Sequence, residues 1–338
     1  MPSYCCAECF GDHGLRRSVI PSRTEGRGQC NFCKATDIDL VTPSKLAAEF
    51  EMLTSIYEFN PEGRLLVEWL KEDWSLFPNL DHANAKSLLA EIMDDVDIVR
   101  KTFTPSLAFK SDGLVAWETL RDELMYKNRY FLNEALDKDR LEVLLSHLTT
   151  NELPEVWHRA RITTSGAAYT IEQMGAPPRN LASHGRANPS GIPYLYLGSS
   201  PETAIAEIRP HTGETASVAQ FILQGPITAV DLRSPRELVS PFLLEDASEV
   251  GRMRADVPFL ERLGNELTRP VLPRSAAIDY LPSQYLCEFI KKIGYNGVIY
   301  RSSVSNGINL ALFDPLKGTA NSVALFDVKR VSVTVSPR

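Results

Sequence analysis

The chain has 338 residues, which is long enough for two or three domains that each bury a core. Hydrophobic residues make up 43% and charged residues 23%, which excludes large-scale disorder, and no run approaches 18 apolar residues. The net charge of −7 argues against broad attraction to nucleic acid or to an anionic membrane. The first residues lack the basic region and apolar run of a signal peptide, so we expect a cytoplasmic protein without a membrane span.

Five of the six cysteines fall within the first 33 residues. Four of them form two C-x-x-C pairs, Cys6/Cys9 and Cys30/Cys33. Paired knuckles at this separation offer four thiolates that can close a tetrahedron around Zn²⁺. Redox or disulfide cysteines are the alternative, and a reducing cytoplasm disfavours them.

Residues 1–40 contain too little apolar periodicity to fold alone, so we predict a zinc-ribbon-like knuckle that depends on its metal. With four protein ligands the zinc has no open position, so its role should be structural. Cys5 lies outside the pattern, although it could replace Cys6 as a ligand. Cys287 stands alone in an expected helix, where packing explains it.

Residues 41–153 show helical periodicity, with runs such as SKLAAEFEMLTSIY and NAKSLLAEIMDDVDIV. We expect four to six helices in a bundle. Within it, Arg140 precedes His147 by a spacing found in the R-x4–6-H pair of HEPN-type ribonucleases. Nearly two helical turns separate the two residues, so we favour a solvated face over an active site.

Residues 154–338 alternate short β-branched and aromatic runs with Gly, Pro, Asn and Ser clusters, and helical stretches lie between them. This pattern predicts a mixed α+β domain of about 180 residues rather than an alternating βαβ array. Neither G-x-G-x-x-G nor a P-loop is present, so a nucleotide site here must be built another way.

The densest stretch of candidate chemistry spans residues 184–210. A turn-rich loop carries Arg186, a short strand carries Tyr196, and Ser199 or Ser200 can cap a following helix. Glu207 lies on that helix among apolar residues, where a carboxylate is costly without partners. It belongs either to the rim of a core face or to a site.

Two further segments complete the candidate site. Arg159 and Arg161 alternate with apolar residues, which suits one face of a half-buried strand. In GYNGVIYRSSVSNGINLALFDP, two β runs flank Asn-Gly, a strong hairpin signal, and Ser302 and Ser303 follow the first run. Taken singly, each of these segments has an ordinary structural explanation.

Together the segments resemble the RES domain, over about residues 155–335. The resemblance rests on the order of Arg159, G-R-x-N-x-x-G-x-P-x-L-Y-L around Arg186, A-x-x-E at Glu207 and G-V-I-Y-x-S at Ser302. The preceding region resembles, on fewer features, the HEPN-like N-terminal domain attached to some RES proteins. The long helical region departs from the compact toxins of the family.

This resemblance implies a fold similar to ADP-ribosyltransferases and a toxin that degrades NAD⁺ by hydrolysis or phosphorolysis, often paired with an antitoxin. It makes Arg159, Glu207 and Ser302 the expected catalytic residues, and Arg186 and Tyr196 supporting substrate-binding residues. Arg161 could take the part of Arg159, and Ser303 that of Ser302. An antitoxin or immunity protein is an open partner, as is a second copy of the chain.

The implied reaction suits these residue types. Guanidinium groups grip a pyrophosphate, so Arg159 and Arg186 are assigned to it. Glu207 would stabilise positive charge on the ribose or orient the incoming water or phosphate, Tyr196 would stack on or wall off the nicotinamide ring, and Ser302 would position substrate. The alternatives are a mono-ADP-ribosyltransferase, a non-enzymatic binding module and, least favoured, a HEPN-type ribonuclease.

Overall fold

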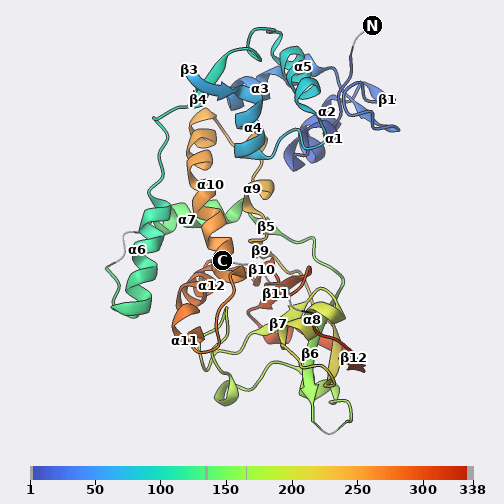
Figure 1. The fold of residues 1–338 in the computed structure, drawn as a ribbon, viewed down its shortest axis with the longest axis vertical. Helices are drawn as coiled ribbons and strands as arrows, with labels where there is room; N and C mark the ends of the chain where they lie inside the picture. Colours follow the sequence, from blue (N-terminus) through green and yellow to red (C-terminus); the bar gives the residue numbers. More distant parts are fainter. Residues whose placement is uncertain (1–2, 134–135, 165, 333–338) are drawn as a thin grey trace. The chain divides into compact units, whose positions relative to one another are not determined.

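A computed structural model describes residues 3–133, 136–164 and 166–332 (Figure 1). The described residues therefore leave out 1–2 of the expected 1–40 domain and 134–135 of the expected 41–153 domain. They also leave out 165 and 333–338 of the expected 154–338 domain. None of the helices in the described ranges combines the length and the apolar character that crossing a bilayer requires.

The chain divides into two compact units, and each unit is discontinuous in sequence. The first contains Met1–Leu114 and Pro235–Pro258, and the second contains Val115–Ser234 and Phe259–Arg338. Helix α10 (Ala247–Thr268) contains Pro258, where the division falls. These two units do not test the domain boundaries expected at residues 40/41 and 153/154, which stay a prediction.

The first unit combines short helices with two small antiparallel sheets, β1–β2 and β3–β4. Aromatic side chains fill its interior, with the Phe10 ring 5.6 Å from that of Phe50. Its remaining elements are α1 (Ala7–Phe10), α2 (Ile20–Arg23), α3 (Ala47–Thr54), α4 (Leu66–Trp74), α5 (His82–Met93), α9 (Pro235–Leu238), β1 (Gly26–Gly28), β2 (Ile38–Leu40), β3 (Tyr57–Leu65) and β4 (Thr102–Pro105).

The pair β3–β4 interrupts a region for which only helices were expected. The strands pair irregularly between Phe59 and Arg64, and Gly63 lies where a Cβ would meet the Phe103 carbonyl oxygen at 2.2 Å. Trp69 of α4 donates its indole N–H to that same carbonyl, at 2.7 Å. The Asn-Pro-Glu-Gly sequence ends the helical pattern here, and the partner strand lies some 40 residues away, where local periodicity carries no signal.

The helices expected between residues 41 and 153 are present as α3, α4, α5, α6 (Gly113–Tyr126) and α7 (Lys138–Ser146). They do not form one bundle, because α7 and all but the first two residues of α6 belong to the second unit. The mixed helix-and-strand class is confirmed for the chain, and the second unit carries its large sheet.

The second unit is built on an eight-stranded sheet in the order β12-β8-β6-β7-β11-β10-β9-β5. The pairings are antiparallel except for β9 with β10. The strands are β5 (Thr149–Thr150), β6 (Val156–Thr163), β7 (Leu195–Gly198), β8 (Thr215–Leu223), β9 (Ala229–Asp231), β10 (Gly297–Arg301), β11 (Ile308–Leu312) and β12 (Gly318–Asp327). Besides α6, α7 and the end of α10, the unit contains the helices α8 (Pro201–Glu207), α11 (Ala276–Asp279) and α12 (Leu281–Lys292).

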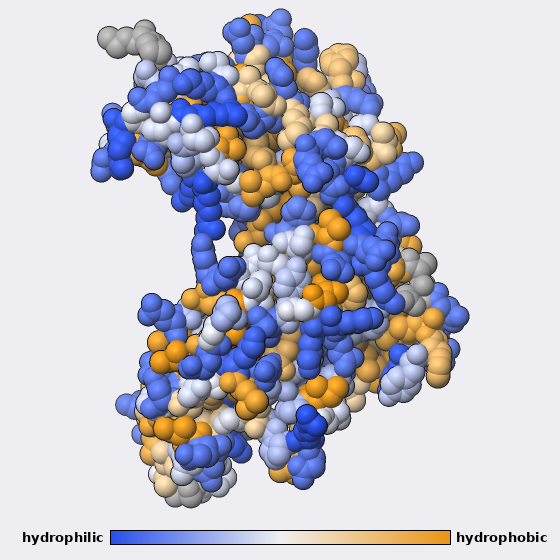
Figure 2. Space-filling view, turned by 180° about the vertical axis from the view of Figure 1, so that it is seen from behind, coloured by the Kyte–Doolittle hydropathy of each residue, from blue (hydrophilic) through white to orange (hydrophobic). Residues whose placement is uncertain are grey.

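The two faces of this sheet differ in chemistry. Alternate residues on one face form the apolar core, among them Trp157, Leu195, Leu197, Leu310 and Leu312. On β7, β11 and β10 the other face carries polar residues and Tyr rings, and α8 packs over part of it against a small cluster around Ala160 and Ala204. Most of the molecular face in Figure 2 is hydrophilic, with hydrophobic residues in small groups.

The Asn-Gly hairpin signal is confirmed, because β10 and β11 pair antiparallel. The ladder ends at Arg301 and Ile308, so the connection is a six-residue loop rather than a two-residue turn. Ser302 explains the longer loop, because its Oγ accepts hydrogen bonds from the backbone N–H groups of Val304 (3.2 Å) and Ser305 (3.0 Å).

Candidate functional site

A cavity of the second unit lies on the polar face of the sheet and has a volume of about 330 Å³. Four side-by-side positions, one from each of four neighbouring strands, contribute to its wall: Tyr300, Asn309, Gly198 and His158. Paired residues of neighbouring strands face the same side of a sheet, so the four form a row. The volume falls in the range of small-molecule sites.

Helix α8 brings Glu207 over this row. Ser200 caps the helix, accepting from the Thr203 N–H at 3.1 Å, and Pro201 occupies its first turn, as the sequence indicated. Ser199, the other candidate cap, accepts from Ile308 N–H at 3.1 Å through its Oγ instead. Gly198 lets the helix approach: a Cβ there would lie 2.8 Å from the Ala204 nitrogen.

Glu207 is the last residue of α8, and its side chain is exposed. Ser302 Oγ donates to Glu207 Oε1 at 2.7 Å, and Asn309 Nδ2 donates to the same oxygen at 2.6 Å. The second oxygen, Oε2, has no hydrogen-bond partner among the described residues. The carboxylate is thus fixed in direction by two donors and keeps one oxygen available.

Arg159 lies on β6 where that strand and β7 part, since the two pair only at His158 and Gly198. Its Nη1 donates to the Tyr196 carbonyl at 3.3 Å, and its buried Nε has no hydrogen-bond partner in the described part of the chain. Burial and the nearby Arg161 lower the pKa of Arg159 to about 10, so the group stays charged at neutral pH.

Arg161 shares the strand with Arg159, as the alternation predicted, but lies outside the cavity lining. Its guanidinium donates to the Gln173 carbonyl and lies 4.7 Å from the centre of the Tyr169 ring. Ser303 lines the cavity, whereas Ser302 is the serine that is bonded to Glu207.

Tyr196 organises the loop that carries Arg186. Its hydroxyl accepts from Ala187 N–H at 2.9 Å and donates to Asn188 Oδ1 at 2.7 Å. Gly185 leaves room for this arrangement, because a Cβ there would lie 2.6 Å from the hydroxyl. Burial raises the pKa of Tyr196 above its usual value, so the hydroxyl keeps its proton.

Arg186 also lines the cavity. Its Nη1 donates to the Arg269 carbonyl at 2.8 Å, and its guanidinium carbon lies 5.2 Å from the centre of the Tyr280 ring. Within the described ranges, neither Arg186 nor Arg159 is paired with a carboxylate, so both positive charges remain available to an anion.

Several cavity residues were not anticipated from the sequence. Asn309 could have been found, because it is a buried polar residue within an apolar strand. His184 and Tyr280 carry no such local signal. Arg209, two residues after Glu207, adopts φ of 48° as α8 ends, a backbone conformation that costs energy in a non-glycine residue.

The four predicted zinc ligands meet in the first unit. The Sγ atoms of Cys6, Cys9, Cys30 and Cys33 lie within 4.8 Å of one another. The Cys6–Cys9, Cys6–Cys33 and Cys9–Cys30 separations are 4.0, 3.5 and 3.3 Å. Four thiolates about 2.3 Å from one Zn²⁺ would be about 3.8 Å apart, so the set fits a tetrahedral ion.

The other cysteines lie outside this cluster. Cys5 donates its thiol to the Val41 carbonyl at 3.4 Å, and burial raises its pKa, as it also does for Cys287. Hydrogen bonds from the Cys6 and Cys9 thiols lower the pKa of Cys30, and Cys6, unlike Cys5, belongs to the four cysteines whose sulfur atoms lie within 4.8 Å of one another. A metal is therefore better served by Cys6 than by Cys5.

Arg140 lies in the first turn of α7, and His147 caps the C-terminal end of that helix. Both have interaction partners, and neither belongs to the cavity lining. The cavity therefore gives no support to a ribonuclease-like pair of Arg140 and His147.

The RES domain model matches residues 156–330, which include more than half of the chain and all five predicted catalytic and substrate-binding residues. The protein belongs to the RES domain family. A solved structure titled as the M. tuberculosis MbcT–MbcA toxin–antitoxin complex is similar at 15% sequence identity, over 55% of this chain and 93% of that chain, with a TM-score of 0.33. No curated protein sequence matches the chain. The HEPN-like resemblance of residues 41–153 stays a prediction.

Proposed function

We propose that this RES protein consumes NAD⁺ by cleaving its nicotinamide–ribose bond. The observation that carries the proposal is the pairing of opposite open charges in one cavity. Among the described residues, one Glu207 carboxylate oxygen has no donor, and Arg159, which lines the same cavity, has a buried Nε without a hydrogen-bond partner. NAD⁺ has a matching pair of features, a ribose that becomes cationic and an anionic pyrophosphate.

The reaction needs little acid catalysis, because nicotinamide leaves as a neutral base. The bond between ribose C1′ and the pyridine nitrogen breaks, and its electron pair goes to that nitrogen. Positive charge then develops on the ribose, as in glycoside hydrolysis. Water or phosphate adds to C1′, giving ADP-ribose and a proton, or ADP-ribose 1″-phosphate.

Glu207 would act on the developing charge. Ser302 and Asn309 hold Oε1, so Oε2 would face the ribose or hydrogen-bond one of its hydroxyls without reorientation. The same oxygen would take a proton from an incoming water. Ser302 is engaged as a donor to Glu207, and we assign it a positioning role rather than that of a nucleophile.

The two arginines would hold the pyrophosphate. Arg159 stays charged at neutral pH, and Arg186 spends one N–H on a neutral carbonyl, which leaves its charge uncompensated. Guanidinium groups bind phosphate oxygens through paired hydrogen bonds, which a lysine cannot do. The Tyr196 hydroxyl is engaged in its loop, so this residue would offer NAD⁺ only its ring.

The rest of the proposal concerns the biological setting. A toxin or defence effector that acts on cytoplasmic NAD⁺ fits membership of the RES family, and an antitoxin or immunity protein would restrain it. We assign the cysteine cluster a structural Zn²⁺, held by four thiolates with no position left for substrate.

Expression of wild type beside Glu207→Ala in a bacterial host, with cellular NAD⁺ measured, tests the proposal. We expect wild type to deplete NAD⁺ and slow growth, and the variant to do neither. A soluble wild-type protein that leaves NAD⁺ intact would count against the proposal and favour a binding module.

Purified protein incubated with NAD⁺ identifies the acceptor. Free ADP-ribose indicates hydrolysis, and the 1″-phosphate in phosphate buffer indicates phosphorolysis. Labelled protein or nucleic acid would instead identify a mono-ADP-ribosyltransferase. RNA cleavage that His147→Ala abolishes and Glu207→Ala does not would identify a ribonuclease.

A further inference from the structure

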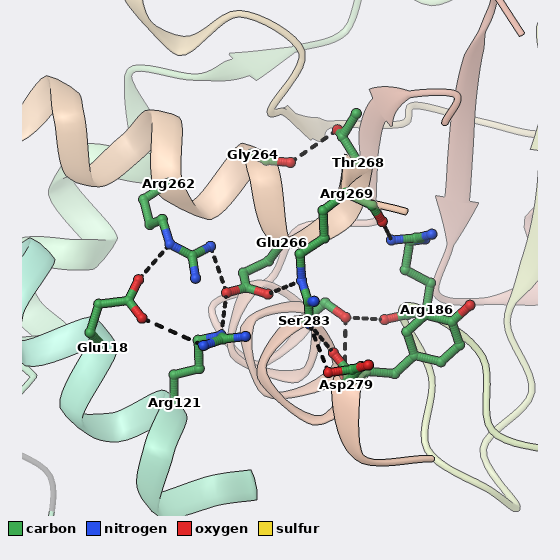
Figure 3. Close-up of polar contacts among 11 residues, drawn as sticks. Glu118, Arg121, Arg186, Arg262, Gly264, Glu266, Thr268, Arg269, Asp279 and Ser283 are labelled. Carbon is green, nitrogen blue, oxygen red and sulfur yellow. Dashed lines mark hydrogen bonds and ion pairs between the residues drawn. The ribbon is translucent and has the colours of Figure 1, made fainter. Parts of the chain in front are cut away.

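Arg186 is hydrogen-bonded to a residue of a buried network of charged side chains (Figure 3). Its centre is Glu266 near the end of α10, whose side chain is wholly shielded from solvent. Three arginines surround that carboxylate, Arg121, Arg262 and Arg269. A buried carboxylate is costly unless it is well paired, and here it is paired three times.

Each oxygen of Glu266 has a defined partner. Oε1 lies 3.0 Å from Arg121 Nε and 2.7 Å from Arg262 Nη1, and both contacts are ion pairs without hydrogen-bond geometry. Oε2 accepts a hydrogen bond from Arg269 Nε at 3.2 Å. The carboxylate thereby fixes the orientation of the Arg269 guanidinium at the end of the helix.

Arg269 in turn supplies one partner of Arg186 and binds the residue that precedes the other. Its carbonyl accepts from Arg186 Nη1 at 2.8 Å, and its Nη2 donates to the Asp279 carbonyl at 2.7 Å, next to Tyr280. Tyr280 is the ring over which Arg186 lies. The network therefore sets the acceptor and the ring against which the Arg186 side chain rests.

The Arg269 carbonyl is well suited to hold a cation. It lies directly after the 22-residue α10, where helix carbonyls have no intrahelical partner, and Pro270 follows it. The partial negative charge of a helix C-terminus favours a guanidinium there. Ser283 Oγ also holds the backbone of Arg186, donating to its carbonyl at 2.6 Å.

The network extends beyond the residues that match the family. Arg121 and Glu118 belong to α6, whereas the family match begins at residue 156. Glu118 pairs with Arg262 and lies 3.6 Å from Arg121, at the exposed side of the network. Helix α6 thus supplies one of the three arginines around Glu266.

We propose that Glu266 is a positioning residue for Arg186, and that α6 completes this support through Arg121. The inference rests on the proposed NAD⁺-cleaving function. Glu266 orients Arg269, and Arg269 fixes the direction from which Arg186 meets the pyrophosphate. Loss of the Glu266 charge leaves three guanidinium groups facing only Glu118 and Asp279, so Arg269 shifts and Arg186 with it.

The test is a double-mutant cycle in the full chain, with Glu266→Gln, Arg186→Ala and the double variant. Misplacing a group that binds NAD⁺ equally in the ground and transition states raises KM and leaves kcat unchanged. We expect Glu266→Gln to raise KM for NAD⁺ by about 10-fold with kcat within about twofold. In the Arg186→Ala background the same substitution should change KM by less than about twofold.

The opposite results overturn the proposal. They are an equal rise of KM in both backgrounds, or a fall in kcat at constant KM. The Kd of ADP-ribose, measured by calorimetry, provides a readout that needs no turnover, and it should follow the same cycle. Failure of wild type to bind ADP-ribose also overturns the proposal, whereas binding without NAD⁺ cleavage contradicts only the proposed reaction.

A second variant serves if Glu266→Gln does not fold. Arg121→Met should raise KM about threefold, and Arg121→Lys should restore part of the loss because it keeps the charge. Asp122→Asn is the matched control on the same helix, since Asp122 pairs with Lys127 at the surface and not with the network. KM changes that are equal in Arg121→Met and Asp122→Asn would contradict a role for Arg121.

Discussion

The cysteine cluster and the cavity around Glu207 both bring together polar side chains from separate segments, yet the polar atoms of the two sites differ in whether they have partners. In the cluster the four sulfur atoms face one another, and three of the four residues are buried. In the cavity, Arg159 Nε is buried without a partner and Glu207 Oε2 is free of donors within the described ranges. Ligands that satisfy one another support a fold, whereas open donors and acceptors are available to a substrate.

Breaking the cysteine cluster should therefore change stability and leave chemistry alone. We expect Cys9→Ser to lose the bound metal and to lower the free energy of unfolding of the first unit on the order of 5 kcal/mol. Metal analysis of the purified protein and thermal unfolding measure both effects. The rate of NAD⁺ cleavage per folded molecule should stay within about twofold.

Cys5→Ser is the matched control, because Cys5 is buried beside the cluster but bonded to the Val41 carbonyl. It should keep the metal. A metal-free but folded protein that has lost NAD⁺ cleavage would contradict the structural assignment of the metal.

Removing the charge of Glu207 should slow the reaction and leave the stability of the fold unchanged. Glu207→Gln keeps the size of the side chain and removes the charge that would stabilise the ribose cation, so kcat should fall roughly 100- to 1,000-fold. The unfolding temperature should barely change, since the side chain is exposed. Glu202→Gln on the same helix is exposed too and lies outside the cavity lining, and its kcat should equal that of wild type.

The two arginines of β6 offer a sharper comparison within one strand. Arg159→Ala should raise KM for NAD⁺ roughly 10- to 100-fold, because a hydrogen bond to a charged group is worth about 1.5–3 kcal/mol. Arg161→Ala should raise it less than about threefold, since Arg161 lies outside the cavity. Steady-state kinetics on both variants decides the matter, and the reverse order would assign the pyrophosphate to Arg161.

The smallest effect is expected at the serines. Ser302→Ala removes one of the two donors to Glu207 Oε1, a hydrogen bond to a charged group worth about 1.5 kcal/mol, so kcat/KM should fall roughly 10-fold. Ser303→Ala should change it less than twofold. A larger effect at Ser303 would mean that the serine lining the cavity, and not the one holding Glu207, meets the substrate.

Local signals were enough for the parts of the site that depend on neighbouring residues. The Asn-Gly hairpin, the Ser200 cap with Pro201, and the alternation that puts Arg159 on one face of a strand are each fixed by short-range geometry. The C-x-x-C spacing likewise predicted which four cysteines meet.

The missing parts depend on residues far apart in sequence. The bond from Asn309 to Glu207 spans 102 residues, and the one from Arg186 to Arg269 spans 83. Likewise, β3 and β4 pair across the intervening α4 and α5. Such partners are set by how elements pack, and periodicity in a short window does not contain that information.

The first unit has a further consequence for how the protein is made. Its residues 1–114 leave the ribosome long before 235–258, yet Phe242 packs on Phe50 and Arg254 pairs with Asp73. At roughly 5–20 residues per second, synthesis of the intervening residues 115–234 takes about 6 to 24 s. During that time the nascent first unit must wait with an apolar ring and a carboxylate uncovered, and it is in this interval that a chaperone would find its binding site.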